Sequence, residues 1–169
     1  MQGNDEHFEE FVHVHHQALL KFGRLLTRDW HTGEDLLQAA LVKVHRRWRD
    51  SAVAEFPLAY TKRVMVTTCT SWRARRWCGE LPTARLPDTP APDETARRLG
   101  TRDTLAQALS RLPVEQRIVL VLRFYEDMTL QETADFLNCP PGTVKSRTNR
   151  ALRSLRESGA IDQRVMEER

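Results

Sequence analysis

The sequence predicts an all-α protein with two small helical domains joined by a Pro-rich linker, the second domain containing a helix-turn-helix. Apolar residues recur at helical spacing along most of the chain and almost nowhere alternate with period two. Even the apolar run 118–122 lacks a following turn signal, so we expect helix there too. Four of the eight prolines fall within residues 79–101, which favours an extended linker. A chain of 169 residues accommodates two small domains, expected at 1–78 and 102–157, with a C-terminal tail at 158–169.

The first domain begins with an amphipathic helix that we expect to end near residues 30–33. Its apolar stripe follows steps of three and four and consists of Phe8, Phe11, Val12, His15, Leu19, Phe22 and Leu26. Thr32 has Asp35 three residues later, a capping arrangement that predicts a second helix over 34–48. The residues of this helix that can pack inward are Leu36, Leu37, Ala40, Val44 and Trp48.

A third helix is predicted from Pro57, which suits a first helical turn, to residue 77. Its buried stripe is expected to consist of Leu58, Val64, Met65, Thr68 and Trp72. The other face is basic and carries hydroxyl groups. Arg63, Thr67 and Ser71 are four residues apart and therefore share that face.

Residues 128–156 contain the clearest motif, a helix-turn-helix. Thr129 can cap a first helix, in which the small Ala134 allows a second helix to approach closely. Asn138 fits a left-handed helix end. The following Pro140-Pro141-Gly142 turns the chain and places a proline in the first turn of the second helix.

The second helix of this motif turns Val144 and Leu152 inward and a polar face outward. The outward residues are Lys145, Ser146, Asn149 and Arg150, with Arg147 and Arg153 beside them. An α-helix fits the DNA major groove, where Arg pairs with guanine, Asn with adenine and Ser with either. This face therefore predicts base readout, with Arg147 and Arg153 on phosphates. The alternative is an ordinary αα-hairpin.

Charge is sorted along the chain, although the net charge is only +3. Residues 1–42 hold three basic and seven acidic residues, whereas 43–77 hold nine basic and two acidic. A second basic block, 139–156, holds five basic residues and no acid. Two cationic stretches on a nearly balanced background indicate a protein that binds a polyanion at two places.

Membrane, secreted and metal-binding classes are disfavoured. No apolar run approaches the about 18 residues of a transmembrane helix, and the acidic residues 1–10 do not resemble a signal peptide, so we expect a cytoplasmic protein without membrane insertion. Cys69, Cys78 and Cys139 lack C-x-x-C spacing. On a helix His13 and His16 come together while His15 turns away, leaving two ligands rather than three. We expect no metal, no cofactor and no enzymatic activity.

The chain resembles the extracytoplasmic function (ECF) sigma factors of bacterial RNA polymerase, and among them a cell-envelope-stress, SigE-like subgroup. In the second domain, residues 112–156 ("LPVEQRIVLVLRFYEDMTLQETADFLNCPPGTVKSRTNRALRSLR") resemble sigma region 4, which binds the −35 promoter element. In the first, residues 33–48 ("GEDLLQAALVKVHRRW") are similar to region 2.2, which docks on the polymerase β′ clamp. Residues 56–77 are similar to regions 2.3 and 2.4, which melt and hold the −10 element.

This resemblance implies roles and partners for particular residues. It implies that Asp35 and Gln38, with Glu34 and Lys43 less firmly, face the β′ clamp, and that Leu37 and Leu41 are either apolar anchors there or intramolecular core. The implied contacts to the −10 single strand and upstream duplex are Arg63, Thr67, Ser71, Arg73, Arg75 and Arg76. Residues 49–55 resemble the family's base-capturing loop, and Trp72 and Trp77 are either core or stacking surfaces. Implied partners are core RNA polymerase, through its β′ clamp and β flap, and promoter DNA. For regulation the resemblance leaves three alternatives: an anti-sigma protein that clamps the apolar faces of both domains, control by expression, and control by proteolysis.

Three positions depart from common family choices. Thr67 stands where many members carry Asn, and Thr148 and Asn149 also differ, so neither promoter element can be taken from relatives. Two rival functions stay open on the sequence alone. A stand-alone helix-turn-helix regulator would use the second domain and not need the first, and a metal-dependent nucleic-acid enzyme would need a cluster of ligands.

Overall fold

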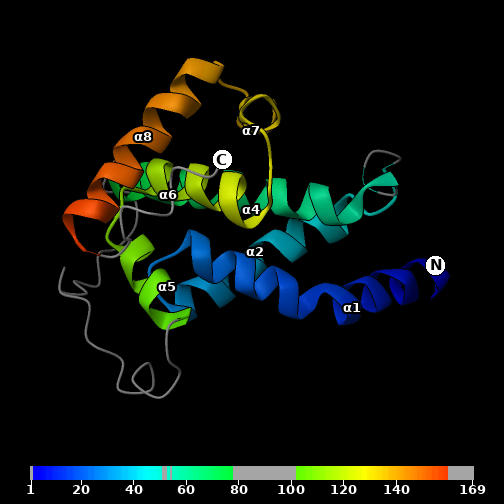
Figure 1. The fold of residues 1–169 in the computed structure, drawn as a ribbon. Coiled ribbons are helices and arrows are strands. Elements are labelled where there is room, and N and C mark those ends of the chain that lie inside the picture. The colour runs from blue at the N-terminus through cyan, green and yellow to red at the C-terminus, as the bar shows by residue number, and fades with distance from the viewer. Residues whose placement is uncertain (1, 51–52, 54, 78–101, 160–169) are drawn as a thin grey trace. The chain divides into compact units, whose positions relative to one another are not determined.

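The computed structural model describes residues 2–50, 53, 55–77 and 102–159, and every element in this part of the chain is a helix (Figure 1). The predicted all-α class is confirmed. The chain divides into two compact units, Met1–Ser71 and Trp72–Arg169. None of the described helices is long and apolar enough to cross a membrane. The predicted linker 79–101 and the tail beyond residue 159 lie outside the described residues.

The first unit begins with two helices that pack along each other, α1 (Gln2–Leu26) and α2 (Trp30–Arg46). Residues of the apolar stripes predicted for these two helices form the contact between them. The buried side chains are Phe11, Leu19, Phe22 and Leu26 from α1 and Leu36, Leu37, Ala40 and Val44 from α2. Phe8 and Phe11 also lie against Trp48, with ring centroids 5.0 Å from the indole in each pair.

The predicted boundary between these helices was wrong by several residues. Asp29, not Thr32, is the N-cap, because its carboxylate accepts both the Thr32 backbone N–H at 2.8 Å and the Thr32 hydroxyl at 2.7 Å. Thr27 ends α1 by donating its hydroxyl to the Gly23 carbonyl at 3.0 Å. The chain thus turns within residues 27–29, and Gly33 lies inside α2.

Helix α4 (Pro57–Trp77) begins at the predicted proline, and its residues up to Ser71 belong to the first unit. Its buried face in that unit consists of Thr61, Met65, Val66, Thr68 and Cys69. The Cys69 thiol lies 3.6 Å from the Leu26 carbonyl oxygen of α1, and the Lys43 ammonium of α2 donates to the Thr68 hydroxyl at 2.8 Å. Helix α4 therefore packs on both other helices of the unit.

The second unit contains α5 (Arg102–Ser110), α6 (Val114–Leu120), the π-helical segment η2 (Val121–Tyr125), α7 (Leu130–Leu137) and α8 (Pro141–Glu157). The run 118–122 is helical as predicted, although its end belongs to the π-helical turn, which the sequence did not indicate. Val119, Ala134 and Val144 form a buried cluster that joins α6, α7 and α8. The small Ala134 thus occupies the close helix contact expected of it.

Arg117 of α6 joins the first two helices of this unit although it is only 1 % exposed. Its guanidinium donates to the backbone carbonyls of Leu109 and Leu112 at 2.9 Å each and of Ser110 at 3.3 Å. Because the last carbonyls of a helix have no partner within the helix, Arg117 acts as a C-terminal cap for α5.

Candidate nucleic-acid interface

The helix-turn-helix is built from three local signals that the sequence carries. Thr129 and Glu132 form a capping box: the Thr129 hydroxyl accepts the Glu132 N–H at 3.2 Å, and the Glu132 carboxylate accepts the Thr129 N–H at 2.7 Å. Asn138 adopts φ 49° and ψ 52°, the left-handed conformation that ends α7. Pro141 begins α8. Figure 1 shows α7 and α8 meeting at this turn.

Helix α8 separates an apolar face from a polar one, as predicted. Val144 and Leu152 are buried, together with Ala151 and Leu155. The exposed residues are Lys145, Ser146, Asn149, Arg150 and Arg153, while Arg147 is half-buried. The Thr148 hydroxyl donates to the Val144 carbonyl at 2.8 Å and is half-buried, so Thr148 belongs to the side of the helix. The outward face therefore presents cations and one amide.

Helix α4 carries the second basic surface. Arg63, Thr67 and Arg73 are exposed and Ser71 is half-buried, so these four side chains reach the surface of the helix. Arg75 and Arg76 lie in α4, but their side chains and that of Trp77 are outside the described part of the structure. Trp72 is half-buried, which leaves both of its predicted roles open.

The Thr67 hydroxyl is already used within the helix. Its oxygen lies 3.0 Å from both the Arg63 and the Val64 carbonyl oxygens, to which it donates. Since a hydroxyl has one hydrogen and two lone pairs, Thr67 in this geometry offers acceptor capacity to a ligand and no donor. An amide at this position would offer both.

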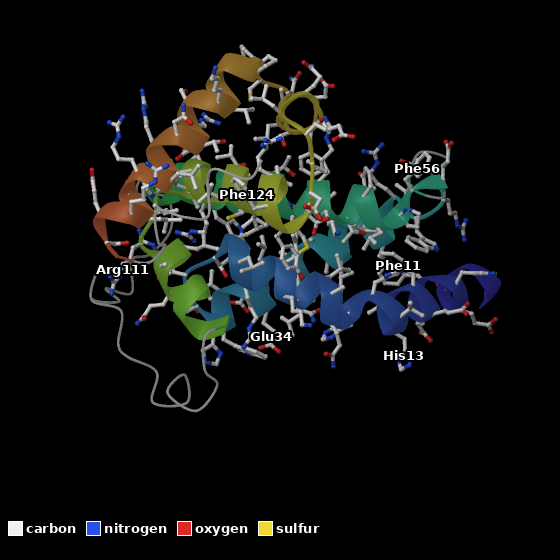
Figure 2. All side chains as sticks on the ribbon, in the orientation of Figure 1. Phe11, His13, Glu34, Phe56, Arg111 and Phe124 are labelled. Carbon is white, nitrogen blue, oxygen red and sulfur yellow. The ribbon has the colours of Figure 1, made fainter. Side chains whose placement is uncertain are left out.

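Sequence reasoning missed two aromatic residues next to this surface. Phe56 is 62 % exposed at the start of α4 (Figure 2), and Tyr60 is half-buried one turn later. The Arg47 guanidinium lies 5.8 Å from the Tyr60 ring centroid and bonds the Asp50 carboxylate at 2.7 Å, a bond that raises the pKa of Arg47. The signal was the spacing: positions 56, 60, 63 and 67 recur every three or four residues and thus lie on one face.

The exposed face of α2 is polar. Asp35 and Gln38 are exposed and Glu34 is half-buried. The interpretation of Leu37 and Leu41 as outward anchors is corrected, because Leu37 has no exposed surface and Leu41 only 8 %. Both belong to the core, the alternative reading of these positions. Val42, four residues after Gln38, is 52 % exposed and is the apolar side chain on this face.

The histidines form no metal centre among the described residues, where no group of three or more potential ligands occurs. His13 is exposed and points away from α2 (Figure 2). His15 instead packs its ring 4.9 Å from that of Phe11. The predicted loop 49–55 is described only in part, with Val53 fully buried.

Two family models match this chain, one on each side of the predicted linker. Sigma-70 region 2 matches residues 11–78, and Sigma-70 region 4 matches residues 108–157. The chain belongs to the sigma-70 family. Because the match includes both regions, a stand-alone helix-turn-helix regulator is not favoured. Sigma factors bind core RNA polymerase and promoter DNA and direct transcription initiation.

Curated relatives of the chain include sigma-E factors and factors named as ECF sigma factors. The chain is 42 % identical over 163 residues to the RNA polymerase sigma-E factor of Streptomyces avermitilis, covering 95 % of this chain and 90 % of the relative. It is 36 % identical to the ECF RNA polymerase sigma factor SigM of Mycobacterium tuberculosis, covering 88 % and 74 %. The predicted SigE-like identity is therefore confirmed, and the protein is an ECF sigma factor.

Two solved structures share the fold. The sigma factor RpoE of Bartonella quintana, described in a co-crystal with the anti-sigma factor NepR, aligns with a TM-score of 0.67 at 22 % identity, covering 94 % of this chain and 99 % of that one. CnrH, described in complex with the cytosolic domain of CnrY, aligns with a TM-score of 0.60 at 23 % identity.

Proposed function

We propose that this ECF sigma factor divides promoter recognition between two helices, α8 for the −35 element and α4 for the −10 element. The observation that supports it most is the match of charge to structure. On α4, Arg63 and Arg73 of the first basic block are exposed, and on α8, Lys145, Arg150 and Arg153 of the second basic block are exposed. Cations spaced along a helix suit DNA phosphates, and the major groove admits a helix.

On α8, the exposed polar face supplies base contacts. Lys145 and Arg150 suit guanine, Asn149 suits adenine, and Ser146 suits either donor or acceptor groups. Arg147 and Arg153 are assigned to phosphates, where they fix the register of the helix without reading sequence.

On α4, the exposed stripe supports binding of a single strand. Phe56 and Tyr60 give the stripe ring surfaces on which unpaired bases can stack, and Arg63 supplies a cation next to them. Thr67 and Ser71 continue the stripe with hydroxyl groups. The cationic residues Arg73, Arg75 and Arg76 then extend it toward the upstream duplex.

On α2, the exposed polar face is assigned to the β′ clamp of polymerase. Asp35 and Gln38 supply polar contacts, and Glu34 and Lys43 flank them. Val42 takes the place of Leu37 and Leu41 as the apolar contact, since an interface anchor needs exposed surface before binding. The second unit would contact the β flap. We propose that the protein acts in the cytoplasm together with polymerase and that polymerase performs the catalysis.

An anti-sigma protein is the further partner that the relatives support. Two proteins of the same fold are described in complexes: the sigma factor RpoE with the anti-sigma factor NepR, and CnrH with the cytosolic domain of CnrY. We expect such a protein to cover the apolar faces of both units. Purification of the tagged chain from its native cells should then recover a stable one-to-one complex, whereas a chain that is always free would contradict this partner.

Run-off transcription on a promoter library tests the proposal. Purified bacterial core polymerase should produce transcripts only when the protein is added, from start sites that share two motifs one promoter spacing apart. Arg150→Ala should relax preference at one −35 position by about 5- to 150-fold, the loss of a bidentate base contact. Arg153→Ala should instead weaken binding to all sequences and lower the salt dependence.

Arg111→Ala serves as the matched control, since Arg111 is an exposed arginine of the second unit outside α8 (Figure 2). It should leave both preference and salt dependence unchanged. Equal effects of Arg111→Ala and Arg150→Ala would contradict the assignment of the −35 contact to α8.

A further inference from the structure

A third cationic surface lies at the junction of α1 and α2, outside both basic blocks. We call it the basic corner, and it consists of Lys21, Arg24, Arg28 and Trp30. Its three cations are all the lysines and arginines of residues 1–42. The acidic residues of α1 lie in its first half, at Asp5, Glu6, Glu9 and Glu10. Charge is therefore separated along α1, with the positive end at the corner.

The corner is held in one geometry by local contacts. The Arg24 guanidinium stacks over the Trp30 indole, 2.8 Å from the ring centroid, and Trp30 is still 39 % exposed. The Thr27 hydroxyl is within 3.1 Å of the Asp29 carbonyl, which closes the turn. The Asp29 carboxylate is bonded to Thr32 as the N-cap of α2.

Contacts between α1 and α4 lead toward this corner. Lys62 of α4 lies 5.6 Å from the Phe22 ring centroid, and Cys69, two turns later, contacts Leu26. The pairs advance in the same direction along both helices, so α4 runs with α1 toward its C-terminal end. Phe22 directly follows Lys21 of the corner in the chain. A cation of α4, Lys62, therefore lies beside the corner within the first unit.

A simpler explanation accounts for part of the corner only. Lys21 and Arg24 lie in the last turns of α1, where cations interact favourably with the helix dipole. Arg28 and Trp30 lie beyond the end of α1, so the dipole of that helix does not explain their positions. Lys21 and Arg28 are exposed, and among the described residues neither forms an ion pair. Such a surface, with an exposed ring beside several cations, is typical of nucleic-acid binding.

We propose that the basic corner binds backbone phosphates of promoter DNA, adjacent to the stretch of DNA that α4 holds. The inference rests on the proposed function of α4 and adds a contact from α1 to it. The approach of Lys62, which neighbours Arg63 in α4, to the corner favours DNA over an acidic protein segment. Lys21 and Arg28 supply the charge, and Trp30 is a positioning residue that holds Arg24.

The salt dependence of promoter binding tests this contact. Holoenzyme is assembled with core polymerase from the wild-type chain, the double variant Lys21→Gln/Arg28→Gln, or the control Arg111→Gln. Affinity for a promoter fragment is measured over a range of salt concentrations. Each phosphate contact contributes about 0.9 to the slope of log K against log salt, so the double variant should lower its magnitude by about 1.8. The control should match the wild type.

Two further measurements identify the source of any effect. The affinity of each variant for core polymerase alone should equal that of the wild type, as should its thermal unfolding midpoint. On a fragment truncated just upstream of the −10 element, the difference between double variant and wild type should disappear. Loss of the difference locates the contact on upstream DNA.

Different outcomes would overturn different claims. A double variant with the wild-type slope would exclude the phosphate contact. An unchanged slope with weaker binding to core polymerase would show that the corner binds an acidic protein surface instead. A wild-type holoenzyme that starts no promoter-dependent transcription would overturn the proposed function itself, independently of the variants.

Discussion

Gly23 of α1 and Gly33 of α2 lie so close that neither position has room for a side chain. A Cβ atom on Gly23 would lie 2.9 Å from the Gly33 carbonyl oxygen and 3.0 Å from the Met65 methyl carbon. One on Gly33 would lie 3.1 Å from the Arg24 backbone nitrogen. Since most of these neighbours are backbone atoms, they cannot move aside without shifting a helix. The two glycines therefore set the distance between α1 and α2.

Gly23→Ala is expected to destabilise the first unit by about 1–3 kcal/mol, the usual cost of overpacking a tight contact. Denaturant unfolding followed by circular dichroism, which reports on the helices of both units, measures this loss. Gly142→Ala is the control, because nothing lies within 4 Å of a Cβ there and alanine favours helix. Equal stabilities of the two variants would contradict the close contact.

At position 138, the ability to adopt a left-handed backbone conformation should matter more for stability than the polarity of the side chain. The Asn138 φ of 49° is accessible to glycine without strain and unfavourable for alanine. We expect Asn138→Ala to lose about 1 kcal/mol of stability and Asn138→Gly to lose nothing or gain a few tenths. Thermal unfolding followed by circular dichroism measures both. A stable Asn138→Ala variant would show that α7 can end in another conformation.

The start of α7 should weaken in acid. The backbone N–H of Thr129, and then its hydroxyl, lower the pKa of Glu132 below the ordinary glutamate value. A lowered folded-state pKa gives stability that is present above the ordinary pKa and is lost as the pH falls through the folded-state value. The protection of the first α7 amides against hydrogen exchange, relative to their intrinsic exchange rate at the same pH, should therefore fall in that range.

Glu132→Gln keeps an acceptor for the Thr129 N–H and removes the titration. In this variant the first α7 amides should have similar protection against exchange near neutral pH, and that protection should no longer fall in acid. The same acid dependence in this variant would assign the effect to another group.

Arg117 should be among the least replaceable residues of the second unit. Arg117→Met removes the donor from three backbone carbonyls at the end of α5 and should cost about 3 kcal/mol. Arg117→Lys retains the charge but not the planar fork, so we expect a smaller loss. Hydrogen exchange of the α5 amides measures the local effect. Unchanged protection in Arg117→Met would mean that other groups cap α5.

The helix-turn-helix could be predicted in detail because its signals are local. The Thr129 cap, the left-handed Asn138 and the first-turn Pro141 each act within four residues of chain. The outward face of α8 then follows from helical periodicity alone. The same holds for Pro57 at the start of α4.

Features that depend on residues far apart in the sequence were harder to predict. Thr32 and Asp35 satisfy a capping pattern, but Asp29 also offers a cap, and the packing of Gly33 against α1 favours the earlier start. Whether Leu37 and Leu41 are buried depends on where α1 and α4 pack, which one helix cannot show. For the same reason the exposure of Phe56 and Val42 became apparent only in the fold.

Several threonine hydroxyls of α4 form hydrogen bonds within the helix itself. Thr61, Thr67 and Thr70 each donate a hydrogen bond from the hydroxyl group to the backbone carbonyl four residues earlier. Such bonds add little to helix stability, so the exposed Thr67 is dispensable for folding. Under the proposed role of Thr67 in contacting the −10 element, a sigma factor lineage could therefore change the promoters that it recognises by exchanging the residue at this position, while the helix that carries it stays intact.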